Sequence, residues 1–585
     1  MVWAESRPLE GGRTTLVRRS ASAVVTEELA APWDVGTCVR EYGGRAHVAW
    51  DDGLAFALDS RGGRLAWLEW NHPHMPWDAA GVFVADVACS RSTEKLPPSQ
   101  AMSDPREAQP DESTNPISAA LGLAGLEDAL RRDLELLDYP RRPWLMPRQG
   151  PEGQVVHDVI VIGGGQGGLV TAFGLRREKV ERVLVLDDRP LDRAGPWLNF
   201  ARMVTLRTPK YLTGPDLGIP NLTILAWFEA QHGRGSWAKL GLVPKETWAG
   251  YLAWYRRVLE IPVQADTLVT RVGPSDVPGL LVVDARRGGV DERHFARRVV
   301  LATGIDGSGA WDVPAMITDS IPRDRWAHTR EDIDFAALVG KRIGVLGAGA
   351  SAFDNASVAL EHGAEAVHLY FRRKQLVDTN AYRWAETVGF LRHMGDLPDP
   401  DKWRFIRQIV RMGQLPPTDT LRRASSHPRF HMHPGSPWER LEMRGDTIVV
   451  TTPTGTDELD FVIVGTGFIT DLSRRPELCA LWPDVALWRD RYEPPEAERH
   501  EDLMRHPYLG SGFEFTEKRP GTAPWVTQIH NYTFGGLLSL GFGGASISGM
   551  KYSVQRLVGA ITRSLFIEDR DAHYAGLCGF DEKEW

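Results

Sequence analysis

The sequence predicts an α/β protein built from two parallel-sheet units, with an appendage at its N-terminus. An apolar run leads into a glycine-rich turn within residues 155–168, and the same order returns within residues 341–352. An apolar run of this length is typical of a buried parallel strand, and closely spaced glycines let such a strand pass directly into a helix. The length of 585 residues also exceeds that of one ordinary domain, so several domains are expected.

The first turn has the spacing Gly163-x-Gly165-x-x-Gly168, and the next apolar run ends in Asp187. The first glycine permits a tight turn, the second lets the backbone approach a pyrophosphate, and the third allows close packing of helix on strand. The phosphates would then lie at the helix N-terminus, where free N–H groups and the helix dipole favour negative charge. Asp187 would accept the ribose hydroxyls. This order of strand, turn, helix and acid predicts a Rossmann-like site for the ADP part of FAD.

The second turn, GAGASA over residues 347–352, has alanine in place of the third glycine, which such turns tolerate. The strand-like run after it, residues 366–371, ends in Arg372 and Arg373 rather than in an acid. An acid there would bond a bare ribose, whereas arginines suit a 2′-phosphate, which they can hold through two hydrogen bonds. Solvated basic residues at a strand end are the alternative interpretation. The second site is therefore predicted to bind NADPH, with hydride transfer to the flavin.

The residues expected to contact the two cofactors come from both turns and from the segments that follow them. They are Gly163, Gly165, Gly168, Asp187, Trp197, Met203, Gly347, Gly349, Ser351, Ala352, Arg372, Arg373, Gly467 and Gly544. Gly467 follows a strand-like run at 460–464, and Gly544 lies among small residues before a helix-like run at 550–563. Small residues before a helix suit the close approach of a backbone to a flat ligand.

Composition narrows the class of protein. Hydrophobic residues make up 42% and charged residues 25%, as in a soluble globular protein. The net charge of −9 argues against a general nucleic-acid binder, and no apolar stretch is long enough to span a membrane. The N-terminus lacks the basic-then-apolar order of a signal peptide, and the four cysteines form no CxxC pair. These features predict a cytoplasmic protein with no metal site, no nucleic-acid partner and no membrane partner.

The N-terminal quarter is harder to interpret. Short β-like pieces at 46–50 and 54–58 could form a small β module, or an appendage with no stable fold. Residues 91–116 are rich in proline, serine and charge, which is typical of a linker. A helix with one apolar face is predicted over residues 117–137.

The remaining chain is expected to divide into interleaved domains. The predicted elements are a helical segment at 226–259, strands at 268–272, 280–285, 299–304, 342–346 and 447–451, and an irregular stretch at 375–437. The predicted domains are an N-terminal appendage and linker (1–116), the first part of a FAD-binding domain (117–322), an NADPH-binding domain (323–445) and the second part of the FAD-binding domain (446–585).

Four further stretches carry a family resemblance: VTLRTPK (204–210), RWAHT (325–329), GAGASAFD (347–354) and DFVIVGTGF (460–468). From residue 155 to the C-terminus the chain resembles the two-dinucleotide-fold, or class B, flavin-dependent monooxygenases. That family includes the flavin-containing monooxygenases, the Baeyer–Villiger monooxygenases and the amino-acid N-hydroxylating monooxygenases. The resemblance implies that NADPH reduces FAD, that O2 adds at flavin C4a, and that the resulting (hydro)peroxyflavin transfers one oxygen atom while NADP⁺ shields it.

The resemblance also implies candidate catalytic residues, which are Arg207, His328 and Ser546. The chain departs from the family at two places. Pro322 and Asp324 stand where the motif before the histidine has an aromatic residue and a glycine, and Arg207 stands where flavin-containing monooxygenases have asparagine. For each candidate a purely structural role is the alternative.

The resemblance to the N-hydroxylases suggests a substrate. DTNAYRWAE (378–386) is similar to a segment that holds the substrate carboxylate through an asparagine, here Asn380, and Lys210 resembles a loop lysine with the same task. With Arg207 and Arg383 nearby in sequence, the pocket is predicted to be cationic, which would suit N-oxygenation of a small amino acid, even an acidic one such as aspartate. These cations could equally be surface charges or contact NADPH phosphates.

Three rival functions stay open at this point. They are a Baeyer–Villiger or sulfur-oxidising monooxygenase, a disulfide reductase on the same plan, and a non-catalytic nucleotide sensor. The reductase would need a redox cysteine pair near the flavin, and the sequence shows none. The expected partners are O2 and a small amine or amino acid, with homo-oligomerisation left open.

Overall fold

The computed structural model describes the backbone of eight strands within residues 2–95, and residues 122–137, 142–212 and 214–585. Contacts divide the chain into two compact units, residues 1–116 and 117–585. The first unit contains two antiparallel sheets. The first sheet has the strand order β1 (Val2–Arg7), β2 (Arg13–Arg19) and β3 (Val25–Glu27). The second has the order β4 (Ala49–Trp50), β5 (Leu54–Leu58), β6 (Arg64–Trp70), β7 (Ala80–Asp86) and β8 (Thr93–Lys95). β5 coincides with the predicted piece at 54–58, β4 covers the last two residues of the piece at 46–50, and β8 lies inside the segment predicted as a linker.

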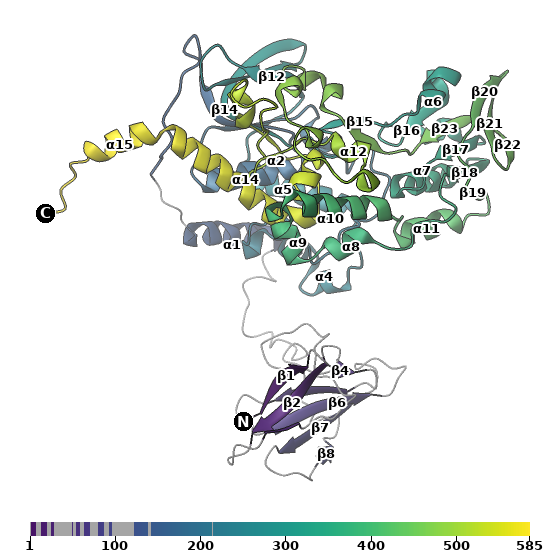
Figure 1. The fold of residues 1–585 in the computed structure, drawn as a ribbon, viewed down its shortest axis with the longest axis horizontal. Helices are drawn as coiled ribbons and strands as arrows, with labels where there is room; N and C mark the ends of the chain where they lie inside the picture. Colours follow the sequence, from purple (N-terminus) through teal and green to yellow (C-terminus); the bar gives the residue numbers. More distant parts are fainter. Residues whose placement is uncertain are drawn as a thin grey trace. The chain divides into compact units, whose positions relative to one another are not determined.

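The larger sheet of the second unit is built around one long strand. The strands follow the order β11 (Val263–Gln264), β10 (Val183–Leu186), β9 (Val156–Ile162), β14 (Val290–Leu301), β13 (Leu281–Arg287) and β12 (Thr267–Pro274), and β25 (Ile529–Asn531) also pairs with β14. The end of β14 is parallel to β9 and β25, while its beginning is antiparallel to β13. Helices α2 (Gln166–Arg177) and α14 (Ile547–Glu568) pack on each other beside this sheet (Figure 1). The carboxyl ends of its parallel strands therefore meet at one edge.

The segment predicted to be helical at 226–259 forms three helices. They are α3 (Ile224–His232), α4 (Ser236–Lys239) and α5 (Lys245–Val258), and α1 (Gly122–Leu136) packs against α3. Gly233 and Gly235 adopt positive φ angles of 90° and 79°, which ends α3 and starts α4. Tyr251 and Tyr255 on α5 are fully buried, and their hydroxyls donate to the carbonyls of Leu222 and Pro215. The aromatic residues of this region form core.

The second sheet is entirely parallel. Its strands follow the order β16 (Trp326–His328), β23 (Phe461–Val464), β17 (Arg342–Leu346), β18 (Ala366–Phe371) and β19 (Phe430–Pro434). Helices α7 (Ala350–Glu361) and α11 (Thr418–Ser425) pack on each other, and α6 (Ala315–Ser320) contacts β20. A small antiparallel sheet of β20 (Arg440–Arg444), β21 (Thr447–Thr452) and β22 (Gly455–Leu459) completes this part. Two strands, β15 (Gly309–Trp311) and β24 (Phe468–Thr470), pair with each other where the chain passes between the two sheets.

The prediction of an irregular stretch at 375–437 is wrong over much of its length. The structure has α8 (Ala381–Ala385), α9 (Val388–His393), α10 (Asp399–Met412) and α11 there. On α10, Trp403, Ile406 and Ile409 recur at helical spacing and are buried, and Gly413 at φ 78° ends the helix. The short apolar stripe becomes a helix because it packs against α13 (Leu537–Leu540), far along the chain.

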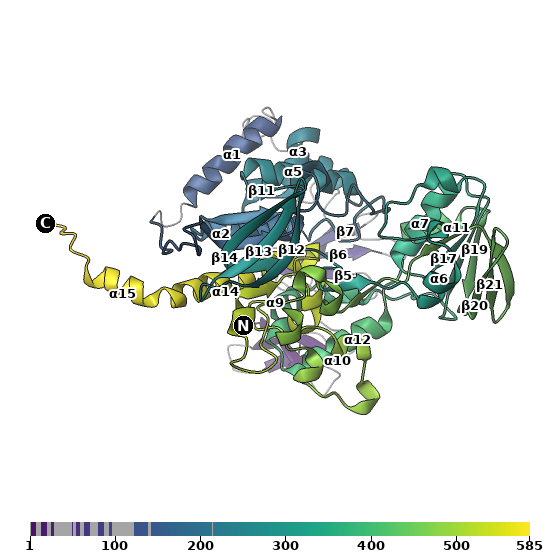
Figure 2. The same cartoon turned by 90° about the horizontal axis from the view of Figure 1, so that it is seen from above.

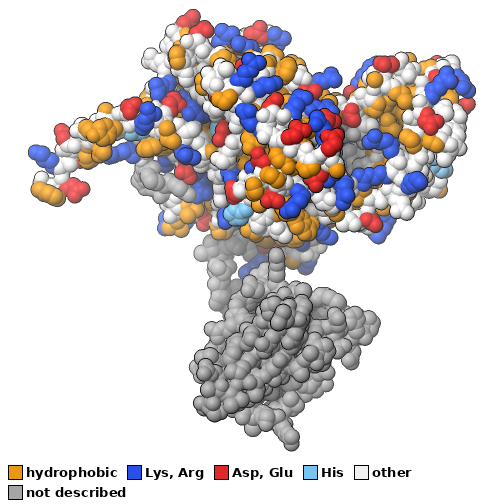
Figure 3. Space-filling view, viewed as in Figure 1, with side chains coloured by type: hydrophobic (Ala, Val, Ile, Leu, Met, Phe, Trp, Pro, Cys, Tyr) orange, Lys and Arg blue, Asp and Glu red, His pale blue; other side chains and the backbone are white. Residues whose placement is uncertain are grey.

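The C-terminal part returns to the first sheet. It contains α12 (Glu501–Met504), β25, α13 and α14, and the chain ends with α15 (Arg570–Cys578), which projects from the body in both views (Figures 1 and 2). Figure 3 shows acidic and basic side chains interspersed over the visible face of the second unit. Among the described residues, no helix is both long enough and apolar enough to cross a bilayer.

Candidate active site

A large cleft of about 1970 Å³ is lined by residues from both glycine turns. Because the turns follow β9 and β17, the cleft lies at the carboxyl ends of parallel strands, where open α/β sheets bind their ligands. Of the predicted cofactor residues, those that line it are Gly163, Gly165, Asp187, Trp197, Met203, Gly349, Ser351, Ala352, Gly467 and Gly544. Ser546, one of the candidate catalytic residues, lines it as well.

The first turn has room for a pyrophosphate. Gly163 has a φ of 110°, and a Cβ there would lie 2.5 Å from the carbonyl oxygen of Ala302, so only glycine fits. A Cβ on Gly165 would meet only the Cα of Gly195, at 3.8 Å. That space is open to the cleft, and no side chain caps the N-terminus of α2. The free N–H groups of the first helical turn therefore suit a phosphate.

Asp187 stands at the end of β10 and fixes the geometry of the first turn. Its carboxylate accepts hydrogen bonds from the backbone N–H groups of Gly164 and Arg189. Burial raises the pKa of Asp187, and the two backbone donors oppose that effect. Because two carboxylate oxygens can accept about four hydrogen bonds, Asp187 keeps acceptor capacity for a ribose hydroxyl.

The second turn repeats this construction. Gly347 has a φ of 128°, and a Cβ there would collide with the carbonyl of Gly465. A Cβ on Gly349 would meet nothing within 4 Å, and no side chain caps α7. Both turns thus fit a dinucleotide. Gly168 and Gly347 do not line the cleft: Gly168 lets α2 lie close to the carbonyl of Gly163, and Gly347 lets the second turn lie close to Gly465.

The basic pair after β18 is placed differently from the prediction. Neither Arg372 nor Arg373 lines the cleft. Arg373 donates to the carbonyls of Arg411 and Met412, at 3.2 Å each, and so caps the C-terminus of α10. That these arginines hold a 2′-phosphate stays a prediction.

Arg207 lines the cleft but is already paired. Its guanidinium donates to Asp354 on α7 at 3.0 Å, and the other oxygen of Asp354 accepts from Thr420 at 3.2 Å. Asp354 is 2% exposed, so burial raises its pKa while Arg207 opposes that effect. The pair joins the loop after the first turn to the helix of the second.

His328 is held in place by both of its ring nitrogens. Nε2 lies 3.1 Å from the carbonyl oxygen of Gly467, and Nδ1 accepts from the backbone N–H of Arg330 at 3.2 Å. The ring also stacks on Trp311, with centroids 5.4 Å apart, and burial lowers its pKa. His328 lines the cleft, but both ring nitrogens already have backbone partners in this geometry, which favours a structural role; its catalytic role stays a prediction.

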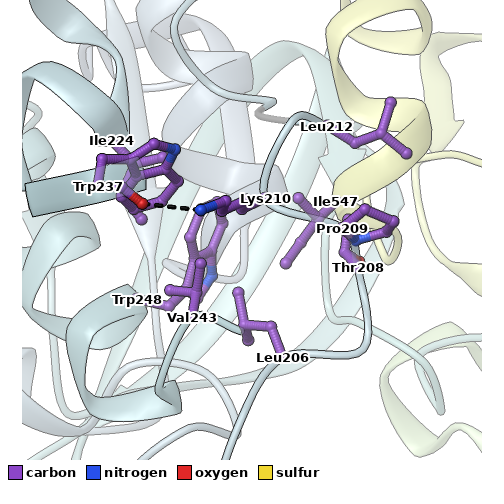
Figure 4. Close-up of a pocket in the computed structure, with 10 residues that line it drawn as sticks. All are labelled: Leu206, Thr208, Pro209, Lys210, Leu212, Ile224, Trp237, Val243, Trp248 and Ile547. Atoms are coloured by element: carbon purple, nitrogen blue, oxygen red, sulfur yellow. Dashed lines mark hydrogen bonds between the residues drawn. The ribbon is translucent and has the colours of Figure 1, made fainter. Parts of the chain in front are cut away.

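Lys210 does not line the large cleft. It borders a small separate pocket with Trp237, Trp248 and Val243 (Figure 4). Its ammonium donates to the carbonyls of Trp237, Ala238 and Leu240 at 2.8, 3.2 and 2.6 Å, at the C-terminus of α4. All three ammonium protons are therefore used by these carbonyls, and the contact of Lys210 with a substrate carboxylate stays a prediction.

The segment around α8 supplies one end of the cleft. Asn380 and Arg383 both line it, but the side chain of Asn380 caps α8 by accepting from the N–H of Arg383. Tyr382 and Phe542, which also line the cleft, stack with an interplanar angle of 13° and centroids 5.6 Å apart. Trp384 lines it too and is 60% exposed. Three aromatic rings, those of Tyr382, Trp384 and Phe542, therefore line the cleft together with polar residues of the same segment.

A carboxylate that the sequence interpretation missed lies beside these rings. Glu386 lines the cleft, and Ser548 near the N-terminus of α14 donates to it at 3.1 Å. Burial raises the pKa of Glu386, whereas Ser548 and the nearby charge of Arg383 oppose that effect. Glu386 closes the stretch that resembles a substrate-holding segment, so that resemblance was the available signal.

Comparisons with known proteins agree with this architecture. A family model described as pyridine nucleotide-disulphide oxidoreductase matches residues 160–386. Two solved structures share the fold. One is ornithine hydroxylase from Pseudomonas aeruginosa, with a TM-score of 0.55 and 18% identity, covering 70% of this chain and 100% of the other. The other is L-lysine 6-monooxygenase from Pseudomonas syringae, with a TM-score of 0.53 and 19% identity, covering 70% of this chain and 99% of the other.

A relative in sequence is much more similar. A FAD-dependent urate hydroxylase from Xanthomonas campestris pv. campestris is 43% identical over 465 residues, which is 80% of this chain and 98% of the relative. Of the cysteines that the structure describes, Cys479 and Cys578, neither lines the cleft, which leaves the disulfide-reductase alternative without support there. The chain belongs to the class B, two-dinucleotide-fold flavin-dependent monooxygenases, and its cofactors are FAD and NADPH.

Proposed function

We propose that this enzyme hydroxylates a flat, N–H-bearing heterocycle of the purine type, with urate as the reference substrate. The observation that supports this most is the end of the cleft formed by Tyr382, Trp384, Phe542 and Glu386. Aromatic side chains stack favourably on a planar ring, and a carboxylate accepts hydrogen bonds from ring N–H groups. The 43% identity to a urate hydroxylase points to the same substrate class.

The chemistry of urate fits a flavin monooxygenase. Its C4=C5 bond carries two nitrogens on C4, so C5 is the electron-rich carbon of an enamine and attacks electrophilic oxygen. The balanced reaction is urate, O2, NADPH and H⁺ giving 5-hydroxyisourate, NADP⁺ and water. Bound FAD would pass the two electrons of NADPH to O2, which makes one oxygen atom electrophilic.

The protein's own residues then have three tasks. The two glycine turns hold the dinucleotides, and Asp187 orients the first of them. The aromatic walls align the substrate ring and exclude water from it. The ion pair of Arg207 with Asp354 keeps the loop of the first half against α7 of the second.

N-oxygenation of a small amino acid, which the sequence favoured, has weaker support in this geometry. Of the three cations expected to bind carboxylates, Lys210 lies outside the cleft, Arg207 is paired, and Arg383 alone faces the cleft exposed. The structures of ornithine and lysine hydroxylases resemble this chain in fold at less than 20% identity, which carries no substrate assignment.

The decisive experiment measures NADPH oxidation, O2 uptake and product by mass spectrometry with the purified holoenzyme. Urate is expected to accelerate NADPH oxidation and to gain one oxygen atom from ¹⁸O2 per NADPH. Aspartate, ornithine, lysine, a cyclic ketone and a thioether serve as comparison substrates. If an amino acid yields a hydroxylamine while urate yields only hydrogen peroxide, N-oxygenation replaces this proposal, and efficient turnover of the ketone or thioether would replace both.

A further inference from the structure

We propose that Glu386 is the general base that removes a ring N–H proton of the heterocycle as C5 receives oxygen, with Ser548 positioning its carboxylate. This inference rests on the proposed function and assigns a residue to it. Glu386 lies in a segment between β18 and β19, in the half of the second unit that carries the second glycine turn.

The contacts of Glu386 place it where the two cofactor halves meet. Ser548, its hydrogen-bond donor, belongs to the first turn of α14. Four residues earlier, the carbonyl of Gly544 accepts from the side chain of Gln166, the first residue of α2 at the first glycine turn. The hydrogen bond between Glu386 and Ser548 therefore connects the half that carries the second glycine turn with the start of α14, beside the first glycine turn. A ring held there would lie between both cofactor sites.

The surroundings suit a base rather than a structural acid. In the part of the chain that the structure describes, Ser548 is the hydrogen-bond donor to Glu386, and the charge of Arg383 acts on it without a direct ion pair. One carboxylate oxygen, Oε1, accepts from Ser548, which leaves Oε2 for a substrate N–H. The rings of Tyr382 and Phe542 stack on each other and line the same cleft as Glu386.

Partial burial suits Glu386 to this role, because burial raises its pKa toward neutrality and makes the carboxylate a stronger base. The charge that opposes burial is Arg383 on α8, and α14 contributes the Ser548 hydroxyl. A base of this kind acts in its ionised form, so activity should fall as the pH drops through the pKa of Glu386.

The proposed step balances as follows. The N9–H bond of urate breaks, its proton goes to the Glu386 carboxylate, and its electron pair forms the N9=C4 bond. The electrons of C4=C5 form the new C5–O bond to an oxygen derived from O2, which NADPH has reduced by two electrons through FAD. The O–O bond breaks, and the second oxygen leaves as water after taking up protons, one of which returns Glu386 to its ionised form.

Three variants of the full-length holoenzyme test the assignment: Glu386→Gln, Ser548→Ala and the control Glu365→Gln. Glu365 is exposed and precedes β18, at the edge of the sheet opposite the cleft. For each variant we would measure flavin reduction by NADPH without substrate, product per NADPH with urate, and the pH profile of kcat/KM.

Glu386→Gln is expected to lower oxygenation of urate by about 100-fold, the smallest usual contribution of a general base, and to divert NADPH into hydrogen peroxide while flavin reduction continues normally. The acidic limb of the wild-type pH profile should disappear in this variant. In Ser548→Ala the limb should move to higher pH, because the carboxylate loses a hydrogen bond that lowers its pKa. Glu365→Gln should match the wild type.

Two outcomes would overturn this inference, and they differ from failure of the proposed function. Product formation by Glu386→Gln within twofold of the wild type, with the acidic limb retained, would exclude Glu386 as the base. A limb that stays in place in Ser548→Ala would exclude the positioning role of Ser548. A wild-type enzyme that oxygenates no purine at all would instead overturn the proposed function, and the role of Glu386 with it.

Discussion

Two cations of the loop after the first glycine turn take their roles from the partners that surround them. Arg207 reaches Asp354 on α7, and Lys210 reaches three carbonyl oxygens at the end of α4. Both cations come from the same loop, yet one ties the two halves of the second unit together and the other fastens the loop to its own half. The distinction depends on which acceptors are within reach, since a charged donor that finds fixed acceptors is no longer available to a ligand.

The ion pair of Arg207 and Asp354 leads to the first prediction. Replacing Arg207 by Ala should lower the free energy of unfolding by about 2 kcal/mol, because it leaves the buried Asp354 carboxylate without its charged partner. The double variant Arg207→Ala/Asp354→Asn should recover part of that loss, since it leaves no unpaired charge. Urea unfolding of the single and double variants measures the coupling, and strictly additive losses would contradict it.

The same variants test the joining of the two halves. If the pair keeps the loop against α7, then Arg207→Ala should also slow flavin reduction by NADPH, while the flavin content of the purified protein stays normal. Unchanged reduction kinetics would confine the ion pair to a role in stability.

The long strand β14 and the long helix α14 do most to assemble the site. β14 pairs with β9 and β25 near its end and with β13 near its start, so it joins the parallel and antiparallel parts of one sheet. α14 begins beside the cleft with Ser546 and Ser548 and ends at a buried ionic cluster 20 residues later. In that cluster Arg297 of β14, fully buried, lies 2.9 Å from Asp569, which also accepts from Arg148 at 2.8 Å.

The ionic cluster at the end of α14 leads to the second prediction. Asp569→Asn should lower the free energy of unfolding at neutral pH by about 3 kcal/mol, because it leaves Arg297 buried with Glu568 as its remaining acid partner. Burial raises the pKa of Asp569, but the bonds from Arg297 and Arg148 outweigh it and hold that pKa below the ordinary value of an aspartate. The stabilisation is therefore full above about pH 4, the ordinary value for an aspartate, and is lost as the pH falls through the folded-state pKa.

Urea unfolding at several pH values checks this prediction. The control is Asp571→Asn, which removes an acid that is 91% exposed on α15. Equal unfolding midpoints for Asp569→Asn and Asp571→Asn would contradict the prediction. It would also be contradicted if, below pH 4, the stability of the wild type fell no more steeply than that of Asp569→Asn.

The chain combines a first unit whose described elements are strands with an oxygenase unit that contains all the cleft residues that the structure describes. The contacts separate residues 1–116 from residues 117–585, and the earliest cleft residue is Ile162. The urate hydroxylase relative aligns with 465 residues, which is less than the full length of this chain. The third prediction is that a protein starting at Ile117 binds one FAD and is reduced by NADPH at the rate of the full chain.

The flavin absorbance per polypeptide and the reduction rate measure this independence. The full-length protein, purified in parallel, is the control. A truncated protein that folds but contains no flavin would mean that the first unit contributes to the cofactor site.

Local geometry explains which parts of this fold could be predicted. Gly163 and Gly347 have φ angles above 100°. Their Cβ positions are blocked by the backbone that follows the neighbouring strand of the sheet, at Ala302 and Gly465. Such a turn tolerates almost no residue but glycine, so its spacing stands out in the sequence. The strands at 342–346 and 366–371 were predicted to the residue for a similar reason: they are short, largely apolar runs in a parallel sheet.

The cofactor turns, the two sheets and the family were therefore present in the order of residues along the chain. The order of residues did not predict helices α8 to α10 or the contact of Glu386 with Ser548. It also did not predict the backbone partners that hold the ring of His328 and the ammonium of Lys210. Glu386 and Ser548 are 162 positions apart, and no periodicity records that they touch. The physical reason is that a hydrogen bond needs its partners within about 3 Å, and only packing of the complete chain determines which donors and acceptors meet at that distance.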